Sequence, residues 1–208
     1  MTRIDQPTQA ASGTDPALDQ TAARRAMIDS QLRTSGVNEP WVLAAMAGVS
    51  RERFVPEAMR DAAYIDRAIP LGEGRFLASP LVHGKMLAEA APTSADNALL
   101  VGDPQGYFAA LLRPLVASLD VVSPADALAT AGRPGYSLIV IDGAAEELPD
   151  SFAGLLAESG RIVTGIVTRG VTRLAVGRKA GDALALLPLA EIGIPVVSEF
   201  AAPKRWSF

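Results

Sequence analysis

The sequence predicts an α/β fold in which a helical amino-terminal part precedes an alternating series of strands and helices. Up to residue 92, apolar residues recur mainly at helical spacing. From residue 97 on, short uncharged apolar runs alternate with helix-like segments, which is typical of an α/β sheet. The chain has 208 residues, 49% of them hydrophobic, which is enough for one such unit with a sizeable core.

The amino-terminal part, residues 19–92, is expected to be mostly helical, after a flexible tail at 1–18. Its first helix is predicted at 21–36, with Asp19 or Thr21 as the cap and Gly36 at the end. The further elements expected here are a helix capped by Asn38, a turn at 51–64, an extended loop at 71–80 and a helix at 79–91.

The remaining part, residues 97–208, is expected to form the sheet within the same domain. Strands are predicted where apolar runs are bounded by glycine, proline or polar residues, at 97–102, 118–123, 136–143, 161–168, 172–179 and 183–192. Helices are predicted at 105–117 and 147–160, and one short helix or a turn at 124–132. The tail at 193–208 is expected to be irregular.

Composition excludes several classes of site and partner. The formal net charge of −4 gives no basic field for nucleic acid. The absence of cysteine and the single histidine, His83, argue against a metal site and a cysteine nucleophile. Residues 1–20 lack the apolar core of a signal peptide, and no apolar run is long enough to cross a membrane. We therefore expect a cytoplasmic protein without a membrane partner.

The stretch LLVGDPQGY, residues 99–107, predicts a loop between a buried strand and a helix. Such loops hold nucleotide-like cofactors when glycines let the ligand approach the backbone. Pro104 stands in the middle of this loop, where it offers no N–H donor. The loop alone leaves two interpretations open, a cofactor site and a simple connection.

Three blocks of sequence resemble a known family. They are RRAMIDSQLRTSGVNEPWVLAAMAGVSRERFVPEAMRDAAYIDRAIPLGEGR, GDPQGYFAALL and YSLIVIDGAAEELPDSFAGLLAESGRIV. In this order they resemble the protein-L-isoaspartate O-methyltransferases, in an alphaproteobacterial-type branch, over residues 22–190. The resemblance implies a Rossmann-like class I methyltransferase sheet. It also implies S-adenosyl-L-methionine as cofactor and methylation of isoaspartyl carboxylates in damaged proteins.

The resemblance also implies where the cofactor would lie. The candidate cofactor-binding residues are Gly102, Asp103, Gly106, Tyr107, Asp142 and Gly143. Asp142 follows the most apolar strand, and the sequence leaves open whether it lines a pocket or caps the next turn.

The sequence departs from the family pattern at each part of the implied cofactor site. Pro104 replaces the middle glycine of the loop, and Leu100 replaces an acidic residue. Ser123 stands where the family has the glutamate that binds the ribose. The segment from Ser123 to Tyr136 is too short for the family's next helix and third strand, so both are expected to be absent.

The implied substrate loop is also altered. Phe76 replaces a threonine and Ala78 replaces a serine, while Ser79 is displaced by one residue and remains the candidate catalytic residue. A shift of one residue in an extended segment turns a side chain to the opposite face. For His83, on the following helix, a structural and a functional role both stay open.

Two functions from different classes compete. The altered motifs favour a degenerate member that binds the cofactor weakly or not at all and serves as an interaction module. The alternative is an active methyltransferase of protein or peptide carboxylates with an atypical site. A sheet without its third strand would expose an edge, so a homodimer is expected. Trp206 and Phe208 are expected either to close the core or to form an interface.

Overall fold

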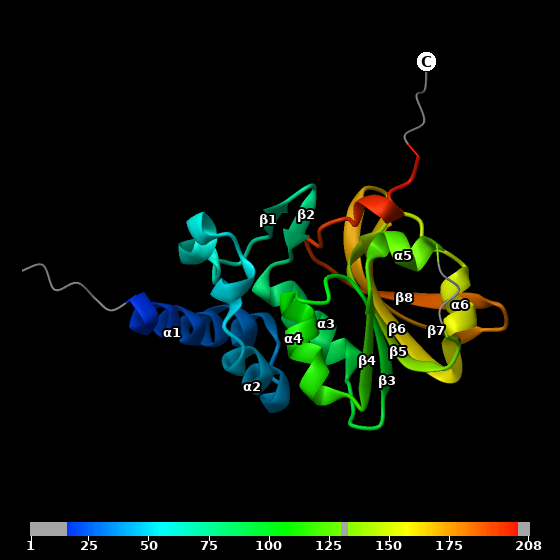
Figure 1. Cartoon of the computed structure of the whole chain (residues 1–208), viewed down its shortest axis with the longest axis horizontal. Helices are drawn as coiled ribbons and strands as arrows, with labels where there is room; N and C mark the ends of the chain where they lie inside the picture. Colours follow the sequence, from blue (N-terminus) through cyan, green and yellow to red (C-terminus); the bar gives the residue numbers. More distant parts are fainter. Residues whose placement is uncertain (1–15, 130–132, 204–208) are drawn as a thin grey trace, which may run out of the picture.

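The computed structural model describes residues 16–129 and 133–203 and confirms the predicted α/β architecture (Figure 1). Its α-helices are α1 (Pro16–Met27), α2 (Pro40–Gly48), α3 (Pro80–Ala90), α4 (Tyr107–Leu112), α5 (Pro124–Ala129) and α6 (Ser151–Leu155). Shorter π or 3-10 helices are η1 (Ile28–Leu32), η2 (Arg33–Ser35), η3 (Arg51–Phe54), η4 (Glu57–Ala62), η5 (Arg113–Leu115) and η6 (Ser198–Phe200). A hairpin is formed by β1 (Ile69–Gly72) and β2 (Arg75–Leu77). The main sheet comprises β3 (Asn97–Val101), β4 (Ser118–Val122), β5 (Tyr136–Ala145), β6 (Leu156–Thr168), β7 (Val171–Ala180) and β8 (Ala183–Glu191).

The main sheet has the strand order β4-β3-β5-β6-β7-β8. β3 runs parallel to β4 and β5, and β5 runs parallel to β6. β7 and β8 follow as an antiparallel meander at the other edge. In Figure 1 the amino-terminal helices lie at one end of the molecule, with α3 and α4 between them and the sheet.

Both faces of the sheet are covered, which explains why the central residues of β3 and β5, 98–101 and 138–141, are uninterrupted apolar runs. Leu100 and Val140 belong to a buried cluster that includes side chains of α3 and α4. Leu99 and Ile139, their neighbours in sequence, belong to a second cluster that includes Phe152 of α6. Successive residues of a strand point to opposite faces, so a strand covered on both sides has no position for a polar side chain.

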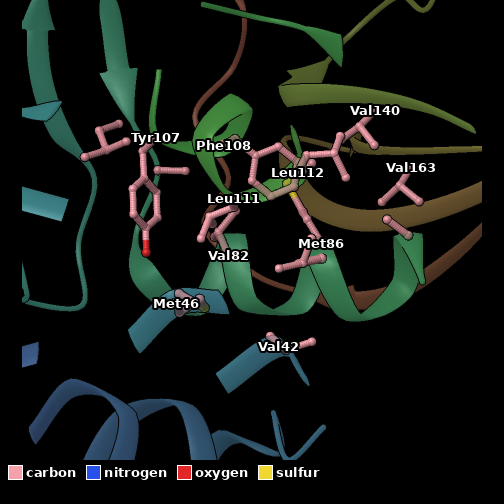
Figure 2. Packing of buried hydrophobic residues seen from close by; sticks show 14 of the residues in the cluster. Val42, Met46, Val82, Met86, Tyr107, Phe108, Leu111, Leu112, Val140 and Val163 are labelled. Carbon is pink, nitrogen blue, oxygen red and sulfur yellow. The ribbon is translucent and has the colours of Figure 1, made fainter. Parts of the chain in front are cut away.

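Figure 2 shows the first cluster around α3. Met86 of α3 and Leu112 of α4 lie near Val140 of the sheet, whereas Val42 and Met46 of α2 lie near α3 on the side away from the sheet. All five side chains are buried. Burying one such side chain stabilises the folded state by roughly 1.5–3 kcal/mol. Because the cluster contains side chains of α2, α3, α4 and the sheet, it joins the amino-terminal helices to the sheet.

The described residues between β4 and β5 contain no strand, as predicted. Among the described residues between β4 and β5, the six-residue helix α5 is the only regular element. β4 is therefore the last strand on its side of the sheet. Its outer edge presents unpaired backbone groups. The homodimer expected from this edge stays a prediction.

The helix predicted at 147–160 is wrong over most of its length. The chain leaves α6 after Leu155 and enters β6 at Leu156. Leu156 is buried and pairs with Tyr136 of β5, and the N–H of Gly135 donates to the carbonyl of Leu155 (2.9 Å). Because these contacts join segments distant in sequence, they override the local helical periodicity.

Two predicted helix caps are also wrong. The first helix begins at Pro16, so Asp19 and Thr21 lie inside it. α2 begins at Pro40, so the residue at its N-cap position is Glu39 and not Asn38. The Glu39 side chain forms no capping hydrogen bond. Proline in the first turn lacks an N–H that would need a partner, which reduces the need for a capping side chain.

The glycine signals were more reliable. Gly36 has a φ of 82° at the end of the first helical segment, as predicted. The segment expected as a loop at 71–80 contains the end of β1 and all of β2, and the turn between them carries Gly72 and Gly74 at φ values of 95° and 73°. Only glycine adopts these values without steric cost.

The chain after β8 is irregular, as expected, but it is fixed across the carboxyl end of β5. The N–H of Ala144 donates to the carbonyl of Pro195 (2.8 Å), and the N–H of Val197 donates to the carbonyl of Ala144 (2.9 Å). Phe200 is buried against Phe152, with 6.1 Å between ring centroids. These contacts bring residues 195–200 to the edge where ligands bind in α/β sheets.

An ion pair at the amino ends of the strands ties the sheet to α3. The guanidinium of Arg161 donates to both carboxylate oxygens of Asp96 (2.9 and 3.1 Å) and to the carbonyl of Ala90 (2.6 Å). The hydroxyl of Ser137 also donates to Asp96 (2.6 Å). Burial opposes ionisation of Asp96, but the hydrogen bonds from Arg161 and Ser137 outweigh it and hold the pKa of this carboxyl well below its ordinary value.

We expect Asp96→Asn to lower the free energy of unfolding by about 2–4 kcal/mol at pH 7, because it leaves Arg161 without a counter-charge. Since the pKa of Asp96 is depressed in the folded state, this stabilisation is complete above the unfolded pKa of about 3.9 and is lost as the pH falls further. The free energies of unfolding of the parent chain and of Asp96→Asn, measured by urea denaturation at a series of pH values, should therefore converge in acid. A difference that stays constant to about pH 2 would contradict the assignment.

The matched control is Asp29→Asn. Asp29 pairs with Arg25 and Arg33 at distances of 3.8 and 3.5 Å, but all three side chains are more than half exposed. We expect this variant to change the free energy of unfolding by less than about 0.5 kcal/mol at any pH.

Gly143→Ala should loosen the segment at 195–197. A Cβ on Gly143 would lie 2.5 Å from Cγ2 of Val197 and 3.1 Å from the carbonyl oxygen of Pro195, and the φ of Gly143 is 154°. We expect a loss of about 1–3 kcal/mol in the free energy of unfolding and faster hydrogen exchange at the Val197 N–H. Gly154→Ala is the control, because no atom lies within 4 Å of the added Cβ. Equal exchange at Val197 in both variants would count against the close packing.

Candidate functional site

A cleft of about 580 Å³ opens at the carboxyl ends of β3 and β5. The loop at 102–106, the β1–β2 hairpin and residues 195–199 all contribute to its lining. In Figure 1 the hairpin and the carboxyl-terminal segment stand on either side of this end of the sheet. The volume is in the range of small-molecule sites, roughly 300–1,000 Å³.

Most of the predicted site residues meet at this cleft. Its lining includes Gly102, Asp103, Gly106, Tyr107 and Asp142. The cleft thus gathers the loop after β3 and the end of β5, as the sequence predicted. The question left open for Asp142 is answered, since it lines the pocket.

Ser79 and Gly143 lie outside the lining. The Ser79 hydroxyl accepts a hydrogen bond from the N–H of Val82 (3.4 Å) at the start of α3, and its side chain is buried. Gly143 faces the segment with Val197. In this conformation Ser79 caps a helix and Gly143 allows close packing. Their catalytic and cofactor-binding roles stay predictions.

Three backbone N–H groups of the loop at 102–106 donate to acceptors within the protein. The N–H of Gly102 donates to the carbonyl of Val122 (2.9 Å). The N–H of Gln105 donates to Oδ1 of Asp103 (2.8 Å), and that of Gly106 to the Asp103 carbonyl (2.9 Å). Asp103 therefore closes the turn. With Pro104 offering no N–H, the loop has few donors left for a ligand.

Ser123 is also engaged locally. It lines the cleft after β4 and caps α5, because its hydroxyl accepts from the N–H of Asp126 (3.1 Å) and donates to the Asp126 carboxylate (2.7 Å). The acidic residue within β4, Asp120, accepts a hydrogen bond from the hydroxyl of Tyr136 (2.7 Å). The end of β4 therefore directs no free carboxylate into the cleft.

The carboxyl-terminal segment completes the lining. Pro195, Val196, Val197 and Glu199 contribute to the cleft, and the turn at 198–200 packs against α5. This side of the cleft is therefore built by the chain's own carboxyl-terminal residues. Trp206 and Phe208, offered above as core or interface residues, lie outside the described residues.

Asp142 is connected through His83 to a buried arginine. Oδ1 of Asp142 lies 3.0 Å from Nε2 of His83, and Nδ1 of His83 lies 3.0 Å from Nη1 of Arg51. Arg51 and His83 have no exposed surface, whereas 20% of the Asp142 side chain is exposed. The imidazole of His83 thus links the positive side chain of Arg51 to the negative side chain of Asp142, and Asp142 is the member that reaches the cleft.

These contacts fix the tautomer of the imidazole. A guanidinium can only donate, so Nδ1 of His83 accepts and Nε2 carries the proton that is donated to Asp142. Burial lowers the pKa of His83 and Arg51 acts in the same direction, against the opposite effect of Asp142. Burial also lowers the pKa of Arg51, to about 10. At neutral pH the histidine is therefore neutral and the arginine charged.

Aromatic rings hold the histidine in place. The ring of Phe108 is stacked on His83 at 5.2 Å between centroids, and the ring of Tyr107 lies 5.4 Å away. The guanidinium of Arg51 lies over Tyr107, 5.0 Å from its centroid. Since His83 cannot rotate without displacing these rings, the position of the Asp142 carboxylate is fixed as well.

Arg51 is the residue that sequence reasoning missed. It lies in RERF, where Arg51 and Arg53 are separated by one residue. Arg51 is fully buried and Arg53 is exposed. No periodicity or spacing distinguishes two such arginines, because burial depends on which segment packs over them.

The described residues contain no group of three or more acidic or histidine side chains that could hold a metal ion. Within the same ranges, 16–129 and 133–203, no helix has the length and apolar character needed to cross a membrane.

Comparison with known proteins identifies the family. A family model described as protein-L-isoaspartate(D-aspartate) O-methyltransferase (PCMT) matches residues 22–127, slightly more than half of the chain. A protein-L-isoaspartate O-methyltransferase of Roseiflexus sp. (strain RS-1) is 32% identical over 210 residues, covering 88% of this chain and 96% of the relative. One from Methanoculleus marisnigri is 30% identical, covering 85% and 92%.

A solved structure shows the same fold. It is a putative protein-L-isoaspartate O-methyltransferase of Plasmodium falciparum in complex with S-adenosyl-L-homocysteine, with a TM-score of 0.66 and 15% identity. The alignment covers 86% of this chain and 98% of that protein. The sheet is thus a Rossmann-like class I methyltransferase sheet, and the chain belongs to the protein-L-isoaspartate O-methyltransferase family.

Proposed function

We propose that this chain is a family member whose cleft binds S-adenosylmethionine weakly or not at all, and that it serves as a binding module. The observation that carries the proposal is the engagement of Ser123. The resemblance implies a ribose-binding carboxylate at this position, and here a hydroxyl caps α5 instead. The cytoplasmic location expected from the sequence is part of this proposal.

The residues at the nucleoside end of the cleft do not fit the cofactor. The sheet ends at β4, so no third strand stands beside the position of the adenine. Residues 195–199 line the cleft, and the turn at 198–200 packs against α5. The loop at 102–106 lacks the donor that Pro104 replaces, and the donors of Gln105 and Gly106 are used by Asp103.

The size of these losses supports weak binding. A micromolar site needs about 8 kcal/mol of binding free energy. Each hydrogen bond to a charged group contributes on the order of 1.5–3 kcal/mol, and the ribose carboxylate would accept two. Losing them reduces a micromolar affinity to roughly millimolar, before the missing adenine wall is considered.

The alternative is an active methyltransferase that acts on isoaspartyl carboxylates of proteins. The size of the cleft, about 580 Å³, favours it, as do the names of the relatives. It requires Ser79 or another donor to reach a substrate carboxylate. Ser79 would have to leave its position at the start of α3, where its side chain is buried.

We expect S-adenosylmethionine and S-adenosylhomocysteine at about 0.1 mM to leave the melting temperature unchanged. At a millimolar Kd, mass action adds only about 0.1 kcal/mol, whereas a micromolar Kd would add about 2.7 kcal/mol. The Roseiflexus relative, assayed alongside with an isoaspartyl peptide, serves as the positive control for binding and methyl transfer. A shift of several degrees with this chain, accompanied by methyl transfer, would establish the alternative.

A further inference from the structure

We propose that the cleft binds an organic ammonium group at Asp142, with the apolar body of the same ligand against the apolar side chains of the lining. The inference rests on the proposed function, because it gives the cleft a ligand that needs no nucleoside site. It goes further by naming the chemical class of the ligand, a primary amine on an apolar body.

Asp142 offers one oxygen to a ligand. Its Oδ1 accepts from His83, and no residue in the described part of the chain donates a hydrogen bond to Oδ2. Oδ2 lies beside Gly102, 3.9 Å from the position that a Cβ there would take. Because Gly102 has no side chain, this approach to the carboxylate stays uncovered.

The carboxylate is positioned before any ligand arrives. His83 holds Oδ1 and is itself held by Arg51 and by the stacked ring of Phe108. A fixed carboxylate loses little conformational entropy when it accepts a charge-assisted hydrogen bond. An ammonium group supplies such a donor, and it supplies the charge that a neutral hydroxyl would not.

The other acidic side chains of the cleft already have partners. Asp103 lies 3.8 Å from a guanidinium nitrogen of Arg75, and the Glu199 carboxylate accepts from the hydroxyl of Ser198 (2.7 Å). Arg53 and Arg75 also line the cleft, but neither forms an ion pair with Asp142, whose one side-chain partner among the described residues is His83. The open oxygen of Asp142 is thus the anionic group best placed for a cationic ligand.

The rest of the lining favours an apolar body on the amine. Apolar and aromatic side chains that share this cleft are those of Phe54, Val55, Leu71, Leu77, Tyr107 and Val197. Phe76, also part of the lining, is 48% exposed. Covering such surfaces is favourable in proportion to the apolar area removed from water.

The test uses 2-phenylethylamine and its neutral isostere 2-phenylethanol as probes. His83 is the only histidine, so its ring nitrogens give single ¹⁵N resonances in protein labelled at histidine. We expect saturable shifts of these resonances with the amine at pH 7, and an affinity at least about tenfold tighter than that of the alcohol. Equal binding of the two probes, or no response to the amine, would overturn the inference.

Two variants complete the test. Asp142→Asn keeps an acceptor for Nε2 of His83 but loses the charge, so the amine should bind about tenfold more weakly. Glu199→Gln makes the same change of charge elsewhere in the cleft and should alter the affinity less than about twofold. If Asp142→Asn binds the amine as tightly as the parent chain, Asp142 only balances Arg51 and the inference fails.

The comparison of amine and alcohol needs no variant, so it decides the inference even if Asp142→Asn does not fold. S-adenosylhomocysteine is titrated into the same labelled sample. Micromolar binding of this compound would contradict the proposed function. Failure of the amine alone would contradict only the inference.

Discussion

The buried charge of Arg51 is the constraint on which the site depends. A guanidinium without exposed surface needs acceptors for its donors and a negative charge inside the protein. Arg51 donates to the carbonyls of Ala63 and Ala78 and to His83, which belong to three separate segments. The negative charge comes from Asp142, through His83. The contact between His83 and Asp142 therefore joins the amino-terminal part, which holds the buried positive charge, to the strand that supplies the negative one.

In the proposed function, the same need for internal partners explains why the cleft offers few groups to a nucleotide. Two polar groups of the expected site, those of Asp103 and Ser123, form hydrogen bonds within the chain. Asp103 accepts from the amides of its own turn, and Ser123 accepts from an amide of α5. Such local bonds are compatible with a folded protein but remove donors and acceptors from the cleft. What is left open is one carboxylate oxygen of Asp142, supported from behind by a neutral histidine.

The sequence predicted those features that depend on local pattern. The apolar runs identified β3 to β8, and the length of the segment after Ser123 predicted the missing strand. It failed where distant contacts decide, since the pairing of Leu156 with Tyr136 ends α6 early. The burial of Arg51 and the packing of Val197 on Gly143 depend in the same way on segments far apart in sequence. The site residues could therefore be gathered from motifs, but their partners could not.

In the proposed function, the absence of the third strand and the loss of the ribose carboxylate are one structural change. β4 and β5 lie on either side of β3 and run parallel, so the connection must return along the full length of a strand. With only residues 124–135 available, a helix has to begin directly after β4. Ser123 is then the residue before the first turn, a position that favours serine and disfavours a glutamate. An acidic residue in place of Ser123 could bind a ribose only if its side chain no longer capped α5. Even then, without the third strand the adenine of the same nucleoside would have no neighbouring surface to pack on.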